Sequence, residues 1–272
     1  MRNHNYEKKQ NLWMSLCDIL AAMIFVFLIV LAVFCIQYES DQAHFKNTKE
    51  ILQSSMNTRK EILTKLQEAL RSYGLNSEVI LQAGILRLNN EIISFPASEA
   101  NPNTINLQNI GVLSKIMSEV LPCYAKQKPA VLTTEELPIW CDVGLKNIGA
   151  SVSVNNCSNT RSVNIETIMI EGHTDPTPVK KTASYPDNFA LSAMRASNIW
   201  KLLKACQPNL AELYNENNNK IFGVSGYAYL RPAQKNPNDP RNRRIDVRFV
   251  MEQPKEAFIN LSKRLLGPHQ QF

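Results

Sequence analysis

The chain has 272 residues, a formal net charge of +6 and an apolar fraction of 44%. This length suits one well-buried domain with additional elements better than two full-sized domains. Lysine and arginine are scattered, with no basic stripe interleaved with aromatic residues, which argues against a nucleic-acid-binding protein. The apolar residues are unevenly spread, and their longest run lies near the N-terminus.

The first predicted element is a membrane-spanning helix over residues 12–36. Residues 19–36 carry no charge, and a helix over residues 12–36 would be about 37 Å long, against a hydrocarbon core of about 30 Å. A cleaved signal peptide is the alternative, but its apolar region is normally shorter and no small-x-small cleavage site follows. Lipidation at Cys35 is disfavoured by the bulky Phe34 before it.

The orientation of this helix follows from the charges at its ends. Arg2, Lys8 and Lys9 precede it, whereas Glu39 and Asp41 follow it. The positive-inside rule therefore predicts that residues 1–11 are a cytoplasmic tail and that the chain after about residue 37 is exported. The chain is expected to be a single-pass protein of a bacterial inner membrane.

Residues 37–74 are predicted to be a helix that links the membrane to the periplasmic domain. Gly74 supplies a C-terminal stop. The pattern leaves two interpretations open, a solvated linker helix or a helix that pairs with a second copy of the chain. Both depend on apolar residues with the spacing of one helical stripe, which are Phe45, Leu52, Met56, Leu63, Leu66 and Leu70.

Residues 75–272 are predicted to form one α/β domain, because strand and helix patterns alternate along them. Asn89 and Asn90 favour a turn between the first two strands, and Pro122 ends the first helix. The expected strands cover residues 79–88, 92–95, 165–171, 221–227 and 245–251. The expected helices cover residues 107–121, 189–203 and 258–266.

Six cysteines divide between the two parts of the chain. Cys17 and Cys35 fall in the membrane segment, which leaves an even number of exported cysteines and makes two disulfides plausible. Three connectivities are open, and the absence of a C-x-x-C pair disfavours a zinc or redox centre. Residues 122–162 are expected to be an irregular insert held by disulfides. The exported candidates are Cys123, Cys141, Cys157 and Cys206.

Four sequence motifs in the second half of the chain occur in the order typical of one family. They are Glu171-Gly172-His173-Thr174-Asp175, Asn188 to Ala196, Gly226-Tyr227 with Arg231-Pro232, and Arg241 to Asp246. Over roughly residues 80–251 the chain thereby closely resembles the OmpA-like peptidoglycan-binding domain. The resemblance implies an α/β (α+β) sandwich with a mixed sheet.

The same resemblance implies a ligand site. Asp175 and Arg195 would bind the diaminopimelate of the cell-wall peptide, because an acid and an arginine fork match its ammonium and carboxylate. The alternative is that Asp175 and Arg195 pair with each other on the surface. His173 is not expected to be catalytic, and with Asp175 it offers only two metal ligands. The other residues expected to line or support the pocket are Thr174, Asn188, Leu191 and Arg243.

The segment from Trp13 to Met23 is similar to the start of the transmembrane helix in the flagellar stator subunit MotB and its relatives, which include ZorB of the Zorya anti-phage systems. The resemblance implies that Asp18 takes up and releases the driving proton, since desolvation raises the pKa of a membrane carboxylate. It also implies a second copy of the chain and a ring of MotA-like or ZorA-like subunits as partners. The alternative is that Asp18 only caps the helix near the interface.

Departures from the flagellar pattern favour the ZorB relatives over a flagellar subunit. The cytoplasmic tail is very short, Ala21 replaces the flagellar threonine, and the insert is rich in cysteine. A passive OmpA-like wall anchor remains an alternative, and a TolR- or ExbD-like transducer is disfavoured because those subunits lack this domain. No enzymatic activity, cofactor or metal is expected.

Overall fold

The computed structural model describes residues 3–128, 138–141, 165–180 and 184–252. It divides into two compact units, Met1–Leu52 with Pro254–Phe272, and Gln53–Gln253. The expected helix at residues 258–266 lies outside the described residues, as does most of the predicted insert.

Helix α1 (Asn3–Ser72) supplies the described part of the first unit. Among the described helices it alone is long and apolar enough to cross a membrane. Its large apolar side chains from Trp13 to Ile36 are exposed where the structure describes them. A soluble surface rarely carries so continuous an apolar face, whereas lipid would cover it. The predicted apolar helix is thus confirmed, while its insertion and orientation stay predictions.

The second unit contains a five-stranded mixed sheet with the strand order β1-β2-β7-β4-β6. Strands β4 and β6 run parallel and are joined through helix α3, whereas β7 lies antiparallel between β2 and β4. The sequence prediction of a mixed α/β fold is therefore confirmed. The strands are β1 Glu78–Ile80, β2 Ile85–Leu88, β4 Ile165–Gly172, β6 Phe222–Gly226 and β7 Ile245–Met251.

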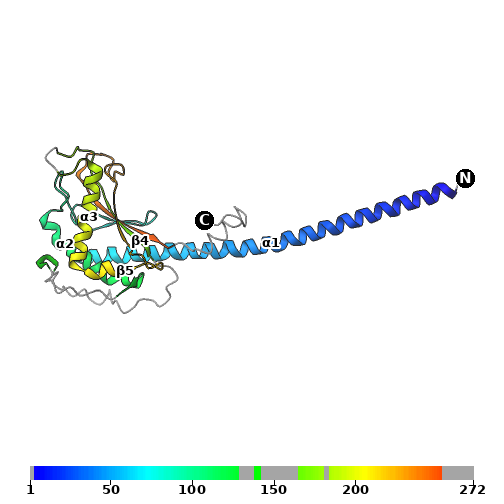
Figure 1. Ribbon diagram of the computed structural model, residues 1–272, viewed down its shortest axis with the longest axis horizontal. Coiled ribbons are helices and arrows are strands. Elements are labelled where there is room, and N and C mark those ends of the chain that lie inside the picture. Colours follow the sequence, from blue (N-terminus) through cyan, green and yellow to red (C-terminus); the bar gives the residue numbers. More distant parts are fainter. Residues whose placement is uncertain (1–2, 129–137, 142–164, 181–183, 253–272) are drawn as a thin grey trace. The chain divides into compact units, whose positions relative to one another are not determined.

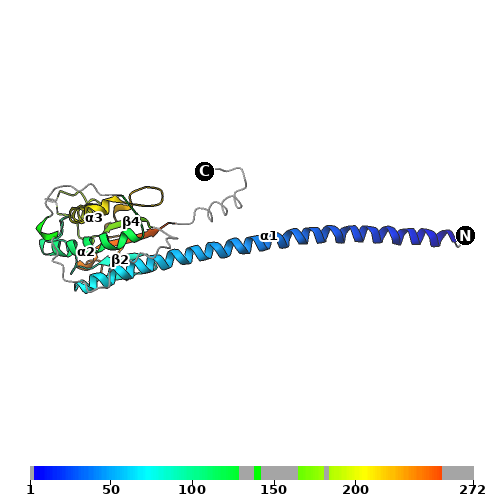
Figure 2. The ribbon, with the colours of Figure 1, turned by 90° about the horizontal axis from the view of Figure 1, so that it is seen from below.

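Two helices pack on the apolar face of this sheet. Helix α2 (Leu107–Val120) contacts helix α3 (Asn188–Cys206), and α3 contacts β4 and β6. Figures 1 and 2 show α2 and α3 next to each other from perpendicular directions. Alternate residues of the strands, such as Ile168, Val247 and Phe249, are buried in this core, as the period-2 pattern of a half-buried strand requires. The opposite face carries charged residues.

The second half of α1 belongs to the domain core, which differs from both interpretations of residues 37–74. Ile62, Leu63, Leu66 and Leu70 are fully buried in the same cluster as α2 and the sheet. Their stripe therefore packs inside this chain rather than facing solvent or a second copy. Only the preceding part of the stripe, at Phe45, Leu52 and Met56, is exposed.

The first hairpin lies earlier in the chain than predicted. Strands β1 and β2 pair antiparallel around a turn that ends at Gly84, whose φ of +67° favours glycine. The predicted strand at residues 92–95 is wrong. The backbone N–H groups of Ile92 and Ile93 both donate to the carbonyl of Asn89, so they close a turn and cannot join a sheet ladder.

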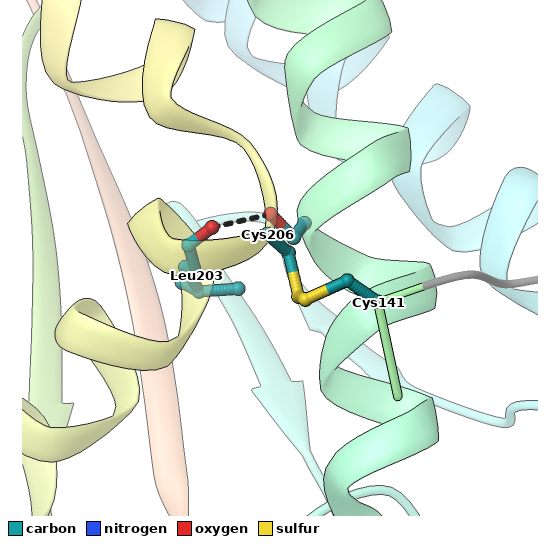
Figure 3. Close-up of a disulfide and its surroundings, with 4 residues drawn as sticks. Cys141, Leu203 and Cys206 are labelled. Carbon is teal, nitrogen blue, oxygen red and sulfur yellow. Dashed lines mark hydrogen bonds between the residues drawn. A yellow bond between two sulfur atoms is a disulfide. The ribbon is translucent and has the colours of Figure 1, made fainter. Parts of the chain in front are cut away.

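A disulfide joins the insert to the end of α3. Cys141, in the short helix η3 (Ile139–Cys141), is bonded to Cys206 (Figure 3). The hydroxyl of Ser114 on α2 donates to the carbonyl of Leu203 at 2.6 Å, one turn before that bond. Cys123 is disulfide-bonded as well, and Cys157 lies outside the described residues. Cys17 and Cys35 are free.

Candidate functional site

The parallel pair β4 and β6 brings the sequence motifs to one edge of the sheet. Gly172 and Gly226 face each other at the ends of these strands. A Cβ atom at Gly172 would overlap the backbone carbonyl of Ser192 on α3, so glycine permits the helix to approach the strand closely. The chain leaving β4 therefore passes beside the N-terminal half of α3, and Asp175 lies three residues beyond the strand.

A small pocket of about 50 Å³ lies at this edge of the sheet. All six residues predicted to bind or support the cell-wall ligand line it, although they come from the end of β4, from α3 and from the loop before β7. They are Thr174, Asp175, Asn188, Leu191, Arg195 and Arg243. A pocket of this size suits the end group of a ligand rather than a whole drug-sized molecule.

The carboxylate of Asp175 is nearly buried and is paired with Arg243. Its Oδ2 accepts a hydrogen bond from Arg243 Nη1 at 2.6 Å, and its Oδ1 accepts one from the backbone N–H of Thr177 at 3.1 Å. Each carboxylate oxygen has two lone pairs, so both can accept a further donor from a ligand. The alternative in which Asp175 pairs with Arg195 is therefore wrong.

Arg195 is fully buried and bonded to backbone carbonyls. Its guanidinium donates to the carbonyls of Glu99 at 2.9 Å, Pro96 at 3.1 Å and His173 at 3.3 Å, and lies over the Phe95 ring. No carboxylate pairs with it in the part of the chain that the structure describes. Burial, together with the nearby positive charge of Arg243, lowers the pKa of Arg195 to about 10. The group stays protonated at neutral pH, and it is a buried cation without a paired anion.

Several polar atoms of the pocket lack a hydrogen-bond partner among the described residues. The Thr174 hydroxyl and the Arg243 Nε are both buried, and neither has a hydrogen-bond partner among the described residues. Arg195 makes three hydrogen bonds with its five N–H groups, which leaves two N–H groups available. Buried polar groups are normally paired. These atoms therefore offer one hydroxyl and several charged donors to a ligand.

The pocket also has a wall that the sequence motifs did not indicate. Ala97 and Ser98 line it from the loop after β2, and Thr177 lines it from the loop after β4. Ser98 has a φ of +60°, and its hydroxyl accepts a hydrogen bond from the backbone N–H of Lys180 at 3.1 Å, so it ties the two loops together. Small residues in loops carry no periodic signal, and only the adjacent Phe95-Pro96 pair marks this segment.

His173 lies behind the pocket, on the charged face of the sheet. Its ring stacks on Tyr227 and lies 3.5 Å from Asp246. Burial, reinforced by the positive charge of Arg244, lowers the pKa of His173 to about 3 despite the opposing effect of Asp246. The imidazole is therefore neutral at physiological pH, and it is not among the residues that line the pocket.

Glu171, His173 and Asp246 come close enough together to suggest a metal centre. However, Glu171 forms two hydrogen bonds with Arg248, and Asp246 bonds to Arg87 and Arg244. Burial would raise the pKa of Asp246, but the Arg87 hydrogen bonds and the Arg244 charge outweigh this and hold it below its usual value. Three guanidinium groups already neutralise these carboxylates, so the cluster is an ion-pair network that supports the strand ends.

Asp18 belongs to the other unit of the structure. Its side chain is exposed on α1, with the exposed apolar residues Trp13, Leu16 and Ile19 around it in sequence. The apolar surface therefore begins before Asp18 and continues beyond it, as expected for a carboxylate within a membrane segment.

No family model matches this sequence, and no curated protein matches it. Solved structures match its fold. A crystal structure described as that of a MotB-like protein from Desulfovibrio vulgaris is 15% identical, with a TM-score of 0.45, and covers 74% of this chain and 98% of that one. The periplasmic domain of Helicobacter pylori MotB is 19% identical, with a TM-score of 0.41. That match covers 71% of this chain and 90% of the other.

A third similar structure is the cell wall anchor of the T6SS from Pseudomonas aeruginosa. It is 13% identical, with a TM-score of 0.38, and covers 71% of this chain and 97% of that one. These structures come from MotB-like periplasmic domains and a wall anchor. At such identities and TM-scores, the likeness by itself assigns no function to this chain.

Proposed function

We propose that this protein is a membrane-tethered cell-wall anchor whose pocket binds the free end of diaminopimelate in peptidoglycan. The observation that carries the proposal is the pocket itself, where an acid with spare acceptor capacity lies beside a buried, unpaired arginine. The end group of diaminopimelate carries one ammonium and one carboxylate. Asp175 would accept from the ammonium, while Arg195, Arg243 and Thr174 would donate to the carboxylate.

The site has the features of binding rather than of catalysis. His173 has a pKa lowered to about 3, which makes it a weak base, and it is not among the residues that line the pocket. The hydroxyl of Ser192 donates to the carbonyl of Phe189 and accepts from the backbone N–H of Ala228. Neither group is placed as an activated nucleophile or general base. The function proposed for the domain is therefore adhesion to the wall without chemical change.

The wall anchor is proposed to hold the stator of a proton-driven motor in the inner membrane, with the N-terminus of the chain in the cytoplasm. Asp18 would be the proton-carrying group, because a carboxylate in an apolar helix can cycle between its neutral and ionised forms. A single helix cannot enclose a proton path, so a second copy of the chain and a ring of MotA-like or ZorA-like subunits would complete it. Attachment to the wall would hold this chain still while the partner subunits move against it.

Among stator proteins, the short tail, Ala21 and the cysteine-rich insert favour a ZorB-like subunit of an anti-phage defence system over a flagellar MotB. The second candidate function is a passive anchor in which Asp18 carries no proton. Both candidate functions rely on the same pocket, so they are distinguished only by whether Asp18 carries a proton.

Co-sedimentation of the full-length chain, in detergent, with purified sacculi tests the wall attachment. Asp175→Asn should reduce the bound fraction, since the amide cannot supply the negative charge that an ammonium needs. Asp239→Asn is the matched control, because Asp239 is an acid on an outer loop that pairs with Arg241. Equal loss in both variants, or loss in neither, would remove the pocket from the proposal.

A further inference from the structure

The motif pair Tyr227 and Arg231 has no role in the pocket described above, yet the structure gives it a defined geometry. The guanidinium of Arg231 lies 3.7 Å from the centre of the Tyr227 ring. The ring of Tyr227 also stacks on His173, with ring centres 5.6 Å apart and an angle of 16° between planes. Tyr227 is thus flanked by a neutral imidazole and by an exposed, charged guanidinium.

The loop that carries Arg231 is held in place by hydrogen bonds from three elements. The hydroxyl of Ser192 on α3 accepts from the backbone N–H of Ala228, and Arg244 Nη2 donates to the carbonyl of Arg231, both at 3.0 Å. The side chain of Asn242 accepts from the backbone N–H groups of Ala233 and Gln234. The position of Arg231 is therefore fixed by buried neighbours, although its side chain is exposed.

This loop adjoins the pocket directly. The backbone N–H of Thr174, a residue of the pocket wall, donates to the carbonyl of Ala228 at 2.9 Å. Ala228 is buried and has a φ of +49°, an unusual conformation for a residue with a side chain. Such strain persists where surrounding contacts require it. The three residues that follow, Tyr229, Leu230 and Arg231, are exposed.

Arg231 is also an uncommitted charge. No carboxylate pairs with it within the described ranges of the chain, whereas the nearby Arg241 is paired with Asp239 at 2.7 Å. An arginine stacked on an aromatic ring keeps the edge of its planar fork free for a carboxylate, and holding the fork in place lowers the entropy lost on binding.

Building on the proposed pocket, we infer that Arg231, held by Tyr227, forms a second anion-binding subsite for another carboxylate of the same cell-wall peptide. The pocket would take the end group of diaminopimelate, and Arg231 would take a free carboxylate further along the peptide. Specificity would then depend on a carboxylate that lies outside the diaminopimelate residue, and a peptide with that carboxylate amidated would bind more weakly.

Calorimetry with the full-length chain in detergent tests this, with three probes: free diaminopimelate, a peptide ending in diaminopimelate with a second free carboxylate, and the same peptide with that carboxylate amidated. Arg231→Ala should weaken binding of the acidic peptide about fivefold and leave the other two probes unchanged. Arg231→Lys should recover little, because lysine lacks the planar fork. Arg241→Ala removes the same charge from a paired arginine and is the matched control.

The outcomes separate the subsite from the pocket. If free diaminopimelate fails to bind the wild type, the proposed pocket is wrong. If it binds, but the Arg231→Ala variant has the same affinities as the wild type for the acidic and the amidated peptide, the subsite alone is overturned. Equal weakening by Arg241→Ala would also overturn the subsite, since the effect would then come from net charge. Tyr227→Leu provides a further readout, because loss of the stack should reproduce part of the Arg231→Ala effect.

Discussion

The Nη1 atom of Arg243 donates to Oδ2 of Asp175 at 2.6 Å, across 68 residues of sequence. This contact gives the two pocket arginines, Arg243 and Arg195, different roles. Arg243 is partly exposed and pairs with the acid, whereas Arg195 is fully buried and bonds to the carbonyls of three different loop or strand-end residues. Arg195 therefore positions the pocket walls as well as offering charge to a ligand.

The two arginines should consequently differ in their effect on stability. Arg195→Met leaves three carbonyl oxygens without their donor, which should lower the free energy of unfolding by at least about 3 kcal/mol. Arg243→Met removes one ion pair and leaves Asp175 its hydrogen bond from the backbone N–H of Thr177, so it should cost less, about 1.5 kcal/mol. Denaturant unfolding of both variants measures the difference. Equal losses would contradict the positioning role of Arg195.

His173 should make the domain sensitive to mild acid. Its pKa is about 3 in the folded chain, against an ordinary value of 6.5. Between these values the unfolded state binds one more proton, so stability rises with pH and falls as pH is lowered through this window, by about 1.4 kcal/mol per pH unit. Unfolding midpoints between pH 4.5 and 6.5 measure this slope. In the His173→Gln variant this pH-dependent part of the stability should disappear. If the stability of the variant and of the wild type changed with pH in parallel, the slope could not be assigned to His173.

The four cysteines that follow helix α1 should form two disulfides, Cys141–Cys206 as described and Cys123 with Cys157. Non-reducing peptide mapping after thiol blocking identifies both, and a mixed pattern or four blocked thiols would contradict the pairing.

Cys141 and Cys206 are separated by 65 residues, so the loop-entropy model predicts about 4 kcal/mol of stabilisation. The double variant Cys141→Ala with Cys206→Ala should therefore unfold at a markedly lower denaturant concentration.

Asp18 decides between a stator and a passive anchor. Asp18→Asn keeps the size and hydrogen bonding of the side chain but cannot carry a proton, so membrane insertion and wall binding should persist while motor output is lost. Asp18→Glu keeps a titrating group, displaced by one methylene, and should retain part of the output. Proton flux in vesicles that hold the assembled complex is the measurement. Full flux with Asp18→Asn would leave only the anchor.

Much of the fold could be predicted from local patterns. Strand β7 has the predicted bounds, and β4, β6, α2 and α3 differ by a few residues at their ends, because alternation and helical spacing report directly on burial. The first hairpin could not be placed, since Asn89-Asn90 is a stronger turn signal than the single Gly84. The stripe of α1 was assigned to solvent or to a partner because spacing shows that a face is apolar, not what covers it.

The site was predictable in its residues but not in its contacts. The motifs named six residues that the structure gathers around one pocket. They did not reveal that Asp175 pairs with Arg243, since that contact depends on β7 lying next to β4 in the sheet. Ala97, Ser98 and Thr177 were missed because small loop residues acquire a role only when the loops come together.

The most direct test of the central claim compares two ligands of the full-length chain, a cell-wall stem peptide that contains diaminopimelate and the same peptide with lysine in its place. Within the peptide, the free end of lysine keeps the ammonium of diaminopimelate but lacks the carboxylate beside it, so it cannot use the donors of Arg195, Arg243 and Thr174. Calorimetry should show that the wild type prefers diaminopimelate by at least about tenfold, or 1.4 kcal/mol, and that Asp175→Asn loses a similar factor for diaminopimelate. Equal affinity for the two ligands, or unchanged affinity in Asp175→Asn, would contradict the proposed function.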